Sequence, residues 1–266
     1  MIDVTDVRTE AGVTRRSFSV SVAGDAVPAV LWAPEGAAGP RPLVLMGHGG
    51  SQHKKTPGIR VRAAQYAQKF GYATLAIDAP GHGDRISREE AEEVGRQTLA
   101  RVTGQVATAW TDERMRLFTE RMRTAVPEWK AALDAVQTLD FVGAAGPVGY
   151  WGVSMGTMIG VPFVASEPRI TCAVLGLAGL RPEMGDMEAA ARAITCPVEF
   201  VYQWEDAVAS REAGLALFNA LGSSEKTMHI NPGGHMEIPS FEAASWERFF
   251  HRHLTERAKA QALAAA

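Results

Sequence analysis

The spacing of apolar and polar positions changes after residue 34. SFSVSV (17–22) and AVPAVLWAP (26–34) alternate on either side of the turn pair Gly24-Asp25, which predicts an antiparallel hairpin. Beyond it, short apolar runs end in glycine, proline or polar residues, and stretches of helical length separate most of them. The runs are PLVLMGHG (42–49), YATLAIDAPG (72–81), PVGYWGVS (147–154), ITCAVLGLAG (170–179), PVEFVYQW (197–204) and KTMHINPGGH (226–235). This alternation predicts βαβ units and a mostly parallel sheet flanked by helices.

One connection is too long for a simple loop, because roughly forty residues (86–126) separate two predicted strands before the usual crossover helix begins. Ser87-Arg88-Glu89-Glu90 resembles a capping box that opens one helix, and a second helix begins near Thr111. We expect a helical insertion that forms a lid over the strand ends. Its apolar face either lines the substrate pocket or only seals the lid onto the body. The residues expected to contact substrate are Trp110, Met115, Phe118 and Met122.

Composition limits the classes of partner. A chain of 266 residues with 46% hydrophobic content can bury a large core, and without repeats or a linker we expect one domain over residues 1–266. The 27 Lys and Arg residues against 30 Asp and Glu residues give a net charge of −3, so we expect a small neutral partner and neither nucleic acid nor membrane. The polar, acidic start of the chain has no signal-peptide pattern, which predicts a cytoplasmic protein.

A serine between two glycines stands out as a candidate nucleophile. Gly152-Val153-Ser154-Met155-Gly156 matches G-x-S-x-G, with an apolar strand before it and an apolar helix after it. A sharp strand-to-helix turn exposes the serine oxygen, and larger residues at 152 and 156 would obstruct it. The pentapeptide alone also fits an ordinary Gly-Ser turn, so other residues must support the catalytic interpretation.

The serine needs a base, and the base needs an orienting carboxylate. His235 follows the last predicted strand and Asp206 follows the strand before it, so Ser154, Asp206 and His235 come in the order expected along a parallel sheet. The alternative acids are Glu205 and Asp78. Because adjacent residues at a strand end point in opposite directions, only one of Glu205 and Asp206 can face the histidine, and we assign Asp206.

Two backbone N–H groups are expected to stabilise the oxyanion. Met155 follows the serine at the helix start, where the helix dipole favours negative charge. The second donor is assigned to Gly50, in the loop after LVLMGHGGS, with His48 shaping the turn.

Together, HGGS (48–51), DAPGHGDR (78–85), GVSMG (152–156), QWED (203–206) and PGGH (232–235) resemble the α/β-hydrolase superfamily, most nearly its small carboxylesterase and dienelactone-hydrolase-like members. The resemblance covers nearly the whole chain. It implies an α/β-hydrolase fold with an eight-stranded, mostly parallel sheet whose first strands are antiparallel, and an enzyme without a cofactor. Dienelactone hydrolases carry cysteine where this chain has Ser154, which argues against dienelactone as the substrate.

The expected function is that of a serine esterase that cleaves a small-molecule carboxylic ester, thioester or lactone through an acyl-enzyme. An acyltransferase or C–C bond hydrolase could use the same three residues, and a non-catalytic ligand receptor could use the same fold. No metal site is expected, because the histidines and aspartates that follow neighbouring strands lack the tight spacing of a zinc cluster. These residues are His48, His53, Asp78, His82 and Asp84.

Overall fold

A computed structural model describes residues 2–105, 111–258 and 260. Its centre is a nine-stranded sheet in the order β1-β2-β3-β5-β4-β6-β7-β8-β9. The strands are β1 (Asp3–Glu10), β2 (Val13–Val22), β3 (Asp25–Pro34), β4 (Leu43–Gly47), β5 (Ala73–Ile77), β6 (Val148–Gly152), β7 (Ile170–Gly176), β8 (Val198–Gln203) and β9 (Lys226–Asn231). The pairs β1–β2, β2–β3 and β3–β5 are antiparallel, and every later pair is parallel. The mostly parallel sheet and the hairpin between β2 and β3 are therefore confirmed.

The expected count of eight strands was one too low, because it omitted β1. This strand, DVTDVRTE, has no buried residue and no alternation of apolar and polar positions. It lies at the edge of the sheet and is held by backbone pairing with β2, which hydrophobic periodicity does not report.

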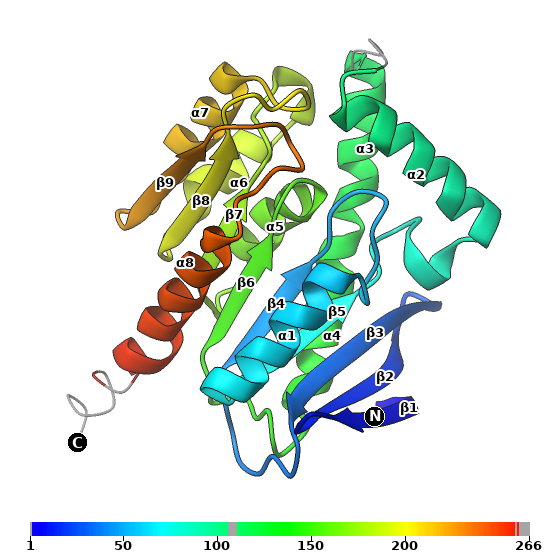
Figure 1. The fold of residues 1–266 in the computed structure, drawn as a ribbon, viewed down its shortest axis with the longest axis vertical. Helices are drawn as coiled ribbons and strands as arrows, with labels where there is room; N and C mark the ends of the chain where they lie inside the picture. Colours follow the sequence, from blue (N-terminus) through cyan, green and yellow to red (C-terminus); the bar gives the residue numbers. More distant parts are fainter. Residues whose placement is uncertain (1, 106–110, 259, 261–266) are drawn as a thin grey trace.

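Helices cover both faces of the sheet (Figure 1). The helices are α1 (Pro57–Phe70), α2 (Arg88–Val102), α3 (Asp112–Arg123), α4 (Ala125–Gln137), α5 (Met155–Ser166), α6 (Met187–Ala193), α7 (Arg211–Ala220) and α8 (Phe241–Phe250). Short 3₁₀ turns η1 (Gly83–Arg85) and η2 (Pro182–Met184) and a π-helical segment η3 (His251–Glu256) complete the set.

Two apolar cores follow from the alternation of side chains along the strands. In β4, Leu43 and Leu45 belong to the core under α4, α5, α6 and α7. Val44 and Met46 point to the opposite face and belong to the core under α1 and α8. All residues of β4 are buried, as expected for a central strand covered on both sides.

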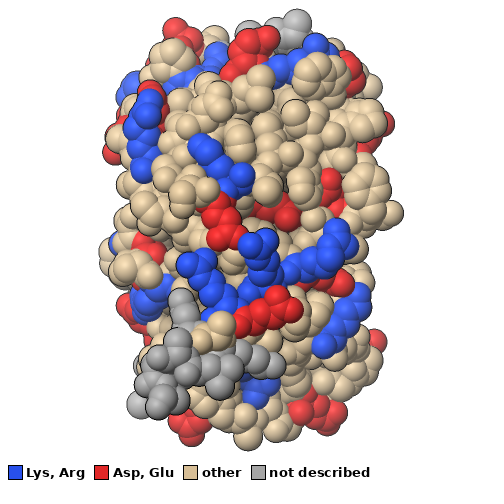
Figure 2. All heavy atoms as spheres, turned by 90° about the vertical axis from the view of Figure 1, so that its left-hand side faces the viewer, with Lys and Arg blue, Asp and Glu red and all other residues tan. Residues whose placement is uncertain are grey.

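The two sheet edges remain polar. β9 is mostly only partly buried, and Lys226 at its start donates hydrogen bonds to the carbonyl groups that end α7. Lysine and arginine side chains intermingle with aspartate and glutamate on the face that Figure 2 presents, the left-hand side of Figure 1. Glu225, for example, pairs with Arg252 and Arg257. Charged edges of this kind discourage pairing with another chain.

The long connection after β5 forms two helices, α2 and α3, followed by α4. Ser87 caps α2 as predicted, because its N–H donates to Glu90 Oε2 and its hydroxyl accepts from the Glu90 N–H. Thr111 caps α3. α3 packs against α5 and η2, and α2 stands farther from the sheet (Figure 1). Among the described residues, no helix has both the length and the apolarity needed to span a bilayer.

Candidate active site

Ser154 occupies a strained turn between β6 and α5. Its backbone angles, φ 58° and ψ −120°, are unfavourable for a residue with a side chain and cost of order 1–3 kcal/mol. Hydrogen bonds to the end of β7 hold the turn: Ser154 N–H donates to Gly176 O over 2.9 Å. The Thr157 hydroxyl accepts from Gly176 N–H at 2.8 Å and also lies 2.6 Å from Gly176 O. The turn thus presents the serine oxygen at the strand ends.

The glycines of the pentapeptide are required by close backbone approaches. A Cβ atom on Gly156 would lie 2.5 Å from the carbonyl oxygen of Gly47, where the first turn of α5 crosses the end of β4. A Cβ atom on Gly152 would lie 2.8 Å from Gly156 O. The main chains therefore touch at positions where any side chain would push them apart.

Ser154, His235 and Asp206 form a hydrogen-bonded series. Ser154 Oγ lies 2.9 Å from His235 Nε2, and His235 Nδ1 lies 2.7 Å from Asp206 Oδ2. Because a carboxylate only accepts, Nδ1 carries the proton and donates it, which leaves Nε2 to accept from the serine hydroxyl. The side chain of Asp206 is fully buried and that of His235 is 4% exposed. The geometry is that of a nucleophile, a base and an orienting acid.

Two backbone N–H groups fix the orientation of Asp206. Its Oδ1 accepts from Val208 at 2.7 Å and from Ala209 at 3.1 Å, so the carboxylate cannot rotate away from His235 without losing them. The histidine loop is fixed by Gln203, whose side-chain amide donates to Glu237 O at 2.8 Å. Sequence analysis did not identify Gln203, because no motif includes it. The signal that could have identified it is a polar residue at the end of a mostly apolar, buried strand.

The two alternative acids lie elsewhere. Glu205 is 64% exposed at its side chain and pairs with Arg211, which agrees with the opposite directions expected for neighbouring residues. Asp78 is completely buried, accepts from the backbone N–H of Lys54 at 2.8 Å and contacts Lys54 Nζ at 2.5 Å. Its carboxylate therefore ties two loops together and does not reach the histidine.

The loop after β4 brings Gly50 to the same cavity as Ser154 and Met155. Gly49 N–H is already used, because it donates to Gln52 Oε1 at 3.3 Å. Within the described part of the chain no hydrogen bond engages Gly50 N–H, and the first N–H groups of a helix such as α5 have no intrahelical acceptor. Both groups are thus available, and their role as oxyanion donors remains a prediction.

His48 supports this loop as a neutral imidazole. Its Nδ1–H donates to Gly49 O at 2.9 Å, and its Nε2 accepts from Ala79 N–H at 3.0 Å. Burial lowers the pKa of His48 to about 4, because the protonated ring would lose water and one of these bonds. His48 therefore joins the Gly50 loop to the loop after β5.

A cavity of about 770 Å³ lies over Ser154 and His235. α3 contributes Met115, Phe118 and Met122 to its wall, three of the four residues expected there. Trp110, the fourth, lies outside the described residues. On the α1 and α8 side the wall is formed by Trp151, Trp246 and Arg62, with the guanidinium 4.1 Å and 4.8 Å from the two ring centres. Sequence analysis missed Arg62 and Trp246 because they come from distant helices without a motif.

The charged residues of this wall have one sign. Four arginines line the cavity, and among the described lining residues there is no aspartate or glutamate. The arginines are Arg62, Arg101, Arg121 and Arg181. A cavity lined in this way disfavours cationic molecules.

The sheet order, the serine turn and the facing histidine define an α/β-hydrolase. No protein-family model and no curated protein matches the sequence. Among solved structures, the chain is 36% identical to a cold-adapted esterase from an Arctic intertidal metagenomic library, solved as a PEG-bound complex, covering 94% of this chain and 97% of that one with a TM-score of 0.77. An acetyl xylan esterase from Paenibacillus sp. R4 is 17% identical over 96% of this chain and 88% of its own, with a TM-score of 0.73, and shares the fold. The chain belongs to the α/β-hydrolase esterase family.

Proposed function

We propose that the protein is a serine esterase that hydrolyses a small-molecule carboxylic ester through an acyl-enzyme on Ser154. The observation that carries this proposal is the hydrogen-bonded series Ser154–His235–Asp206 beneath the cavity. Each of the three side chains has the partner that its role requires, and membership of the esterase family supports ester hydrolysis as the reaction class.

In the first half of the reaction, His235 Nε2 takes the hydroxyl proton as Ser154 Oγ bonds to the carbonyl carbon. The carbonyl oxygen becomes an anion, and the N–H groups of Gly50 and Met155 stabilise it. The tetrahedral intermediate collapses when the bond to the leaving oxygen breaks and His235 donates its proton to that oxygen. The alcohol leaves, and the acyl group stays on Ser154.

In the second half, water replaces the alcohol. His235 takes a proton from the water as its oxygen attacks the acyl carbon, and the second tetrahedral intermediate collapses with return of that proton to Ser154 Oγ. Asp206 stabilises the imidazolium in both halves and keeps the ring in the tautomer that presents Nε2 to the serine.

The cavity supports a small substrate. Its volume of about 770 Å³ lies within the range of roughly 300–1,000 Å³ that is usual for small-molecule sites. Apolar side chains from α2 and α3 line it together with Ser154 and His235, which suits an acyl or alcohol group of moderate size.

The decisive experiment combines a series of p-nitrophenyl esters of increasing chain length with intact-mass analysis of the quenched enzyme. We expect turnover together with a mass increase equal to the acyl group, located on Ser154 by peptide mapping. A fluorophosphonate should label the same serine. Turnover with an acyl adduct elsewhere, or no turnover on any ester, would contradict the proposal. Added alcohols distinguish hydrolysis from acyl transfer, because an acyltransferase would form the new ester in preference to the acid.

A further inference from the structure

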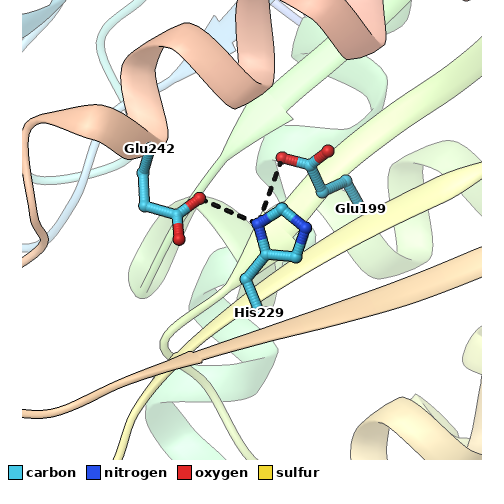
Figure 3. Close-up of side chains that lie close together, drawn as sticks. All are labelled: Glu199, His229 and Glu242. Atoms are coloured by element: carbon cyan, nitrogen blue, oxygen red, sulfur yellow. Dashed lines mark hydrogen bonds and ion pairs between the residues drawn. The ribbon is translucent and has the colours of Figure 1, made fainter.

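Away from the cavity, three ionisable side chains converge where α8 crosses β8 and β9 (Figure 3). Glu199 and His229 point to the same face of the sheet, because Glu199 pairs with Thr227 and His229 is the next residue but one along β9. Glu242 reaches them from the first turn of α8. None of the three lines the catalytic cavity.

Both carboxylates approach the same atom, His229 Nδ1. Glu242 Oε2 lies 2.9 Å from it and Glu199 Oε1 lies 3.8 Å from it, and the three atoms all lie within 4.8 Å of one another. Ligand atoms bound tetrahedrally at about 2.0–2.1 Å from a zinc ion are roughly 3.3 Å apart. The observed separations from Nδ1 bracket this value, and the two carboxylate oxygens, which lie within 4.8 Å of each other, need only approach one another for all three atoms to reach coordination distance.

Each carboxylate is oriented by a separate donor. Asn231 Nδ2 donates to Glu242 Oε1 at 2.9 Å, and Ser245 Oγ donates to Glu199 Oε2 at 3.3 Å. The remaining oxygen of each carboxylate faces His229. Protein metal sites use this arrangement, in which outer hydrogen bonds fix the ligands in place.

One ligand atom lacks a hydrogen bond. Glu199 is only 5% exposed, and its Oε1 is buried with no hydrogen-bond partner among the described residues. A buried carboxylate oxygen in this condition carries an energetic cost, which a cation at the point of convergence would remove. Figure 3 shows this oxygen directed at the imidazole.

We propose that Glu199, His229 and Glu242 bind one divalent transition-metal cation such as Zn²⁺, with water completing the coordination. One imidazole nitrogen and two carboxylates suit Zn²⁺ better than Mg²⁺ or Ca²⁺, which prefer oxygen ligands alone. The imidazole binds the cation through the Nδ1 lone pair, as the neutral tautomer with its proton on Nε2, and the two charges of the cation balance the two carboxylates. The His229 side chain is 33% exposed, so the cation can enter from solvent.

Such a cation would connect β8, β9 and α8. The loops that follow β8 and β9 carry Asp206 and His235, so occupancy would stabilise the scaffold of the catalytic residues without contacting substrate. The proposal does not depend on which reaction Ser154 performs.

The test is calorimetric titration of the chelator-treated, dialysed full-length enzyme with Zn²⁺ at pH 7, together with thermal unfolding. We expect one equivalent bound and a higher Tm. Glu199→Gln and His229→Asn should each weaken binding by roughly tenfold or more, and Mg²⁺ should bind far more weakly than Zn²⁺. His251→Asn is the matched control, because His251 is a partly exposed histidine outside the cluster and its loss should leave the titration unchanged.

A further variant separates this site from the catalytic histidine. His235→Asn should still bind the one equivalent of Zn²⁺ that His229→Asn no longer binds. If His229→Asn does not fold, Glu199→Gln alone decides, because glutamine keeps the shape of the side chain. Absence of Zn²⁺ binding by the wild type, or binding that survives Glu199→Gln, would overturn the proposal and leave the cluster as an ion pair that fastens α8 to the sheet.

Discussion

The floor and the roof of the cavity are built in different ways. On the floor, Ser154, His235 and Asp206 follow three strands, and hydrogen bonds between 2.7 and 3.1 Å fix the histidine and the acid. The roof is the part of the cavity wall to which α2 and α3 contribute side chains. None of the residues of α2 is buried, and α3 buries only Met115, Thr119 and Met122.

This difference separates two kinds of sequence requirement. Each floor position demands one residue type, because a proton has to pass between particular atoms. The roof demands only that one face be apolar, because burial of apolar surface does not depend on direction. Changes on the floor should therefore alter the rate on all substrates, and changes in the roof should alter the ratio between substrates.

The largest effect is expected from Ser154→Ala, which removes the atom that carries the acyl group. We expect the kcat of ester hydrolysis to fall by roughly a million-fold, as for nucleophile loss in a comparable catalytic set, with an unchanged circular-dichroism spectrum. Turnover by Ser154→Ala above about one per cent of the wild-type rate would show that another group attacks the ester.

The next largest effect is expected from Asp206→Asn. The amide favours the wrong tautomer of His235 and cannot stabilise its charged form, so kcat should fall by about 10⁴-fold. Glu205→Gln is the matched control at the adjacent, exposed position and should remain near wild type. A larger loss from Glu205→Gln than from Asp206→Asn would show that the acid has been misassigned.

In the roof, Phe118→Ala should change selectivity and not chemistry. Loss of contact in the cavity is worth about 1–3 kcal/mol between long and short esters, so relative kcat/KM across the series should shift by roughly tenfold or more. Leu117, the neighbour on α3, is 51% exposed and does not line the cavity, so Leu117→Ala should leave the ratios constant. If Phe118→Ala instead changed kcat/KM by the same factor on every ester, the residue would only seal α3 onto the body.

The smallest effect concerns His48 and appears only in acid. Its pKa is about 4 in the folded protein and about 6.5 when unfolded, so between these values the unfolded state binds more protons. The free energy of unfolding should therefore fall as the pH falls, by roughly 2 kcal/mol between pH 7 and pH 5 from this group. Urea unfolding at both pH values should show a shallower decrease in His48→Gln, and an equal decrease would assign the pH dependence to other groups.

The sequence predicted the floor better than the roof. The pentapeptide and the strand order placed Ser154 and His235, and the alternation of side chains at a strand end separated Asp206 from Glu205. The supporting Gln203 and Thr157 could not be recognised, because buried amides and hydroxyls occur in many cores without a motif. The edge strand β1 was missed because backbone pairing alone holds it.

For the roof, periodicity identified the apolar face of α3 but not what it faces. The cavity wall opposite, with Arg62 on α1 and Trp246 on α8, depends on tertiary packing between segments that are far apart in the sequence. The cluster around His229 was missed for the same reason, because β8, β9 and α8 each contribute one of its side chains.

The contact between Gly156 and Gly47 has a consequence for how this enzyme can diversify. The distance from the serine turn to the loop that carries Gly50 is set by two main chains in contact, with no side chain between them. Descendants of this sequence therefore cannot widen or narrow the reaction centre by exchanging residues there without displacing a whole strand or helix. New substrate preferences must come from the side chains of the surrounding helices, so chemistry and selectivity can evolve on separate parts of the chain.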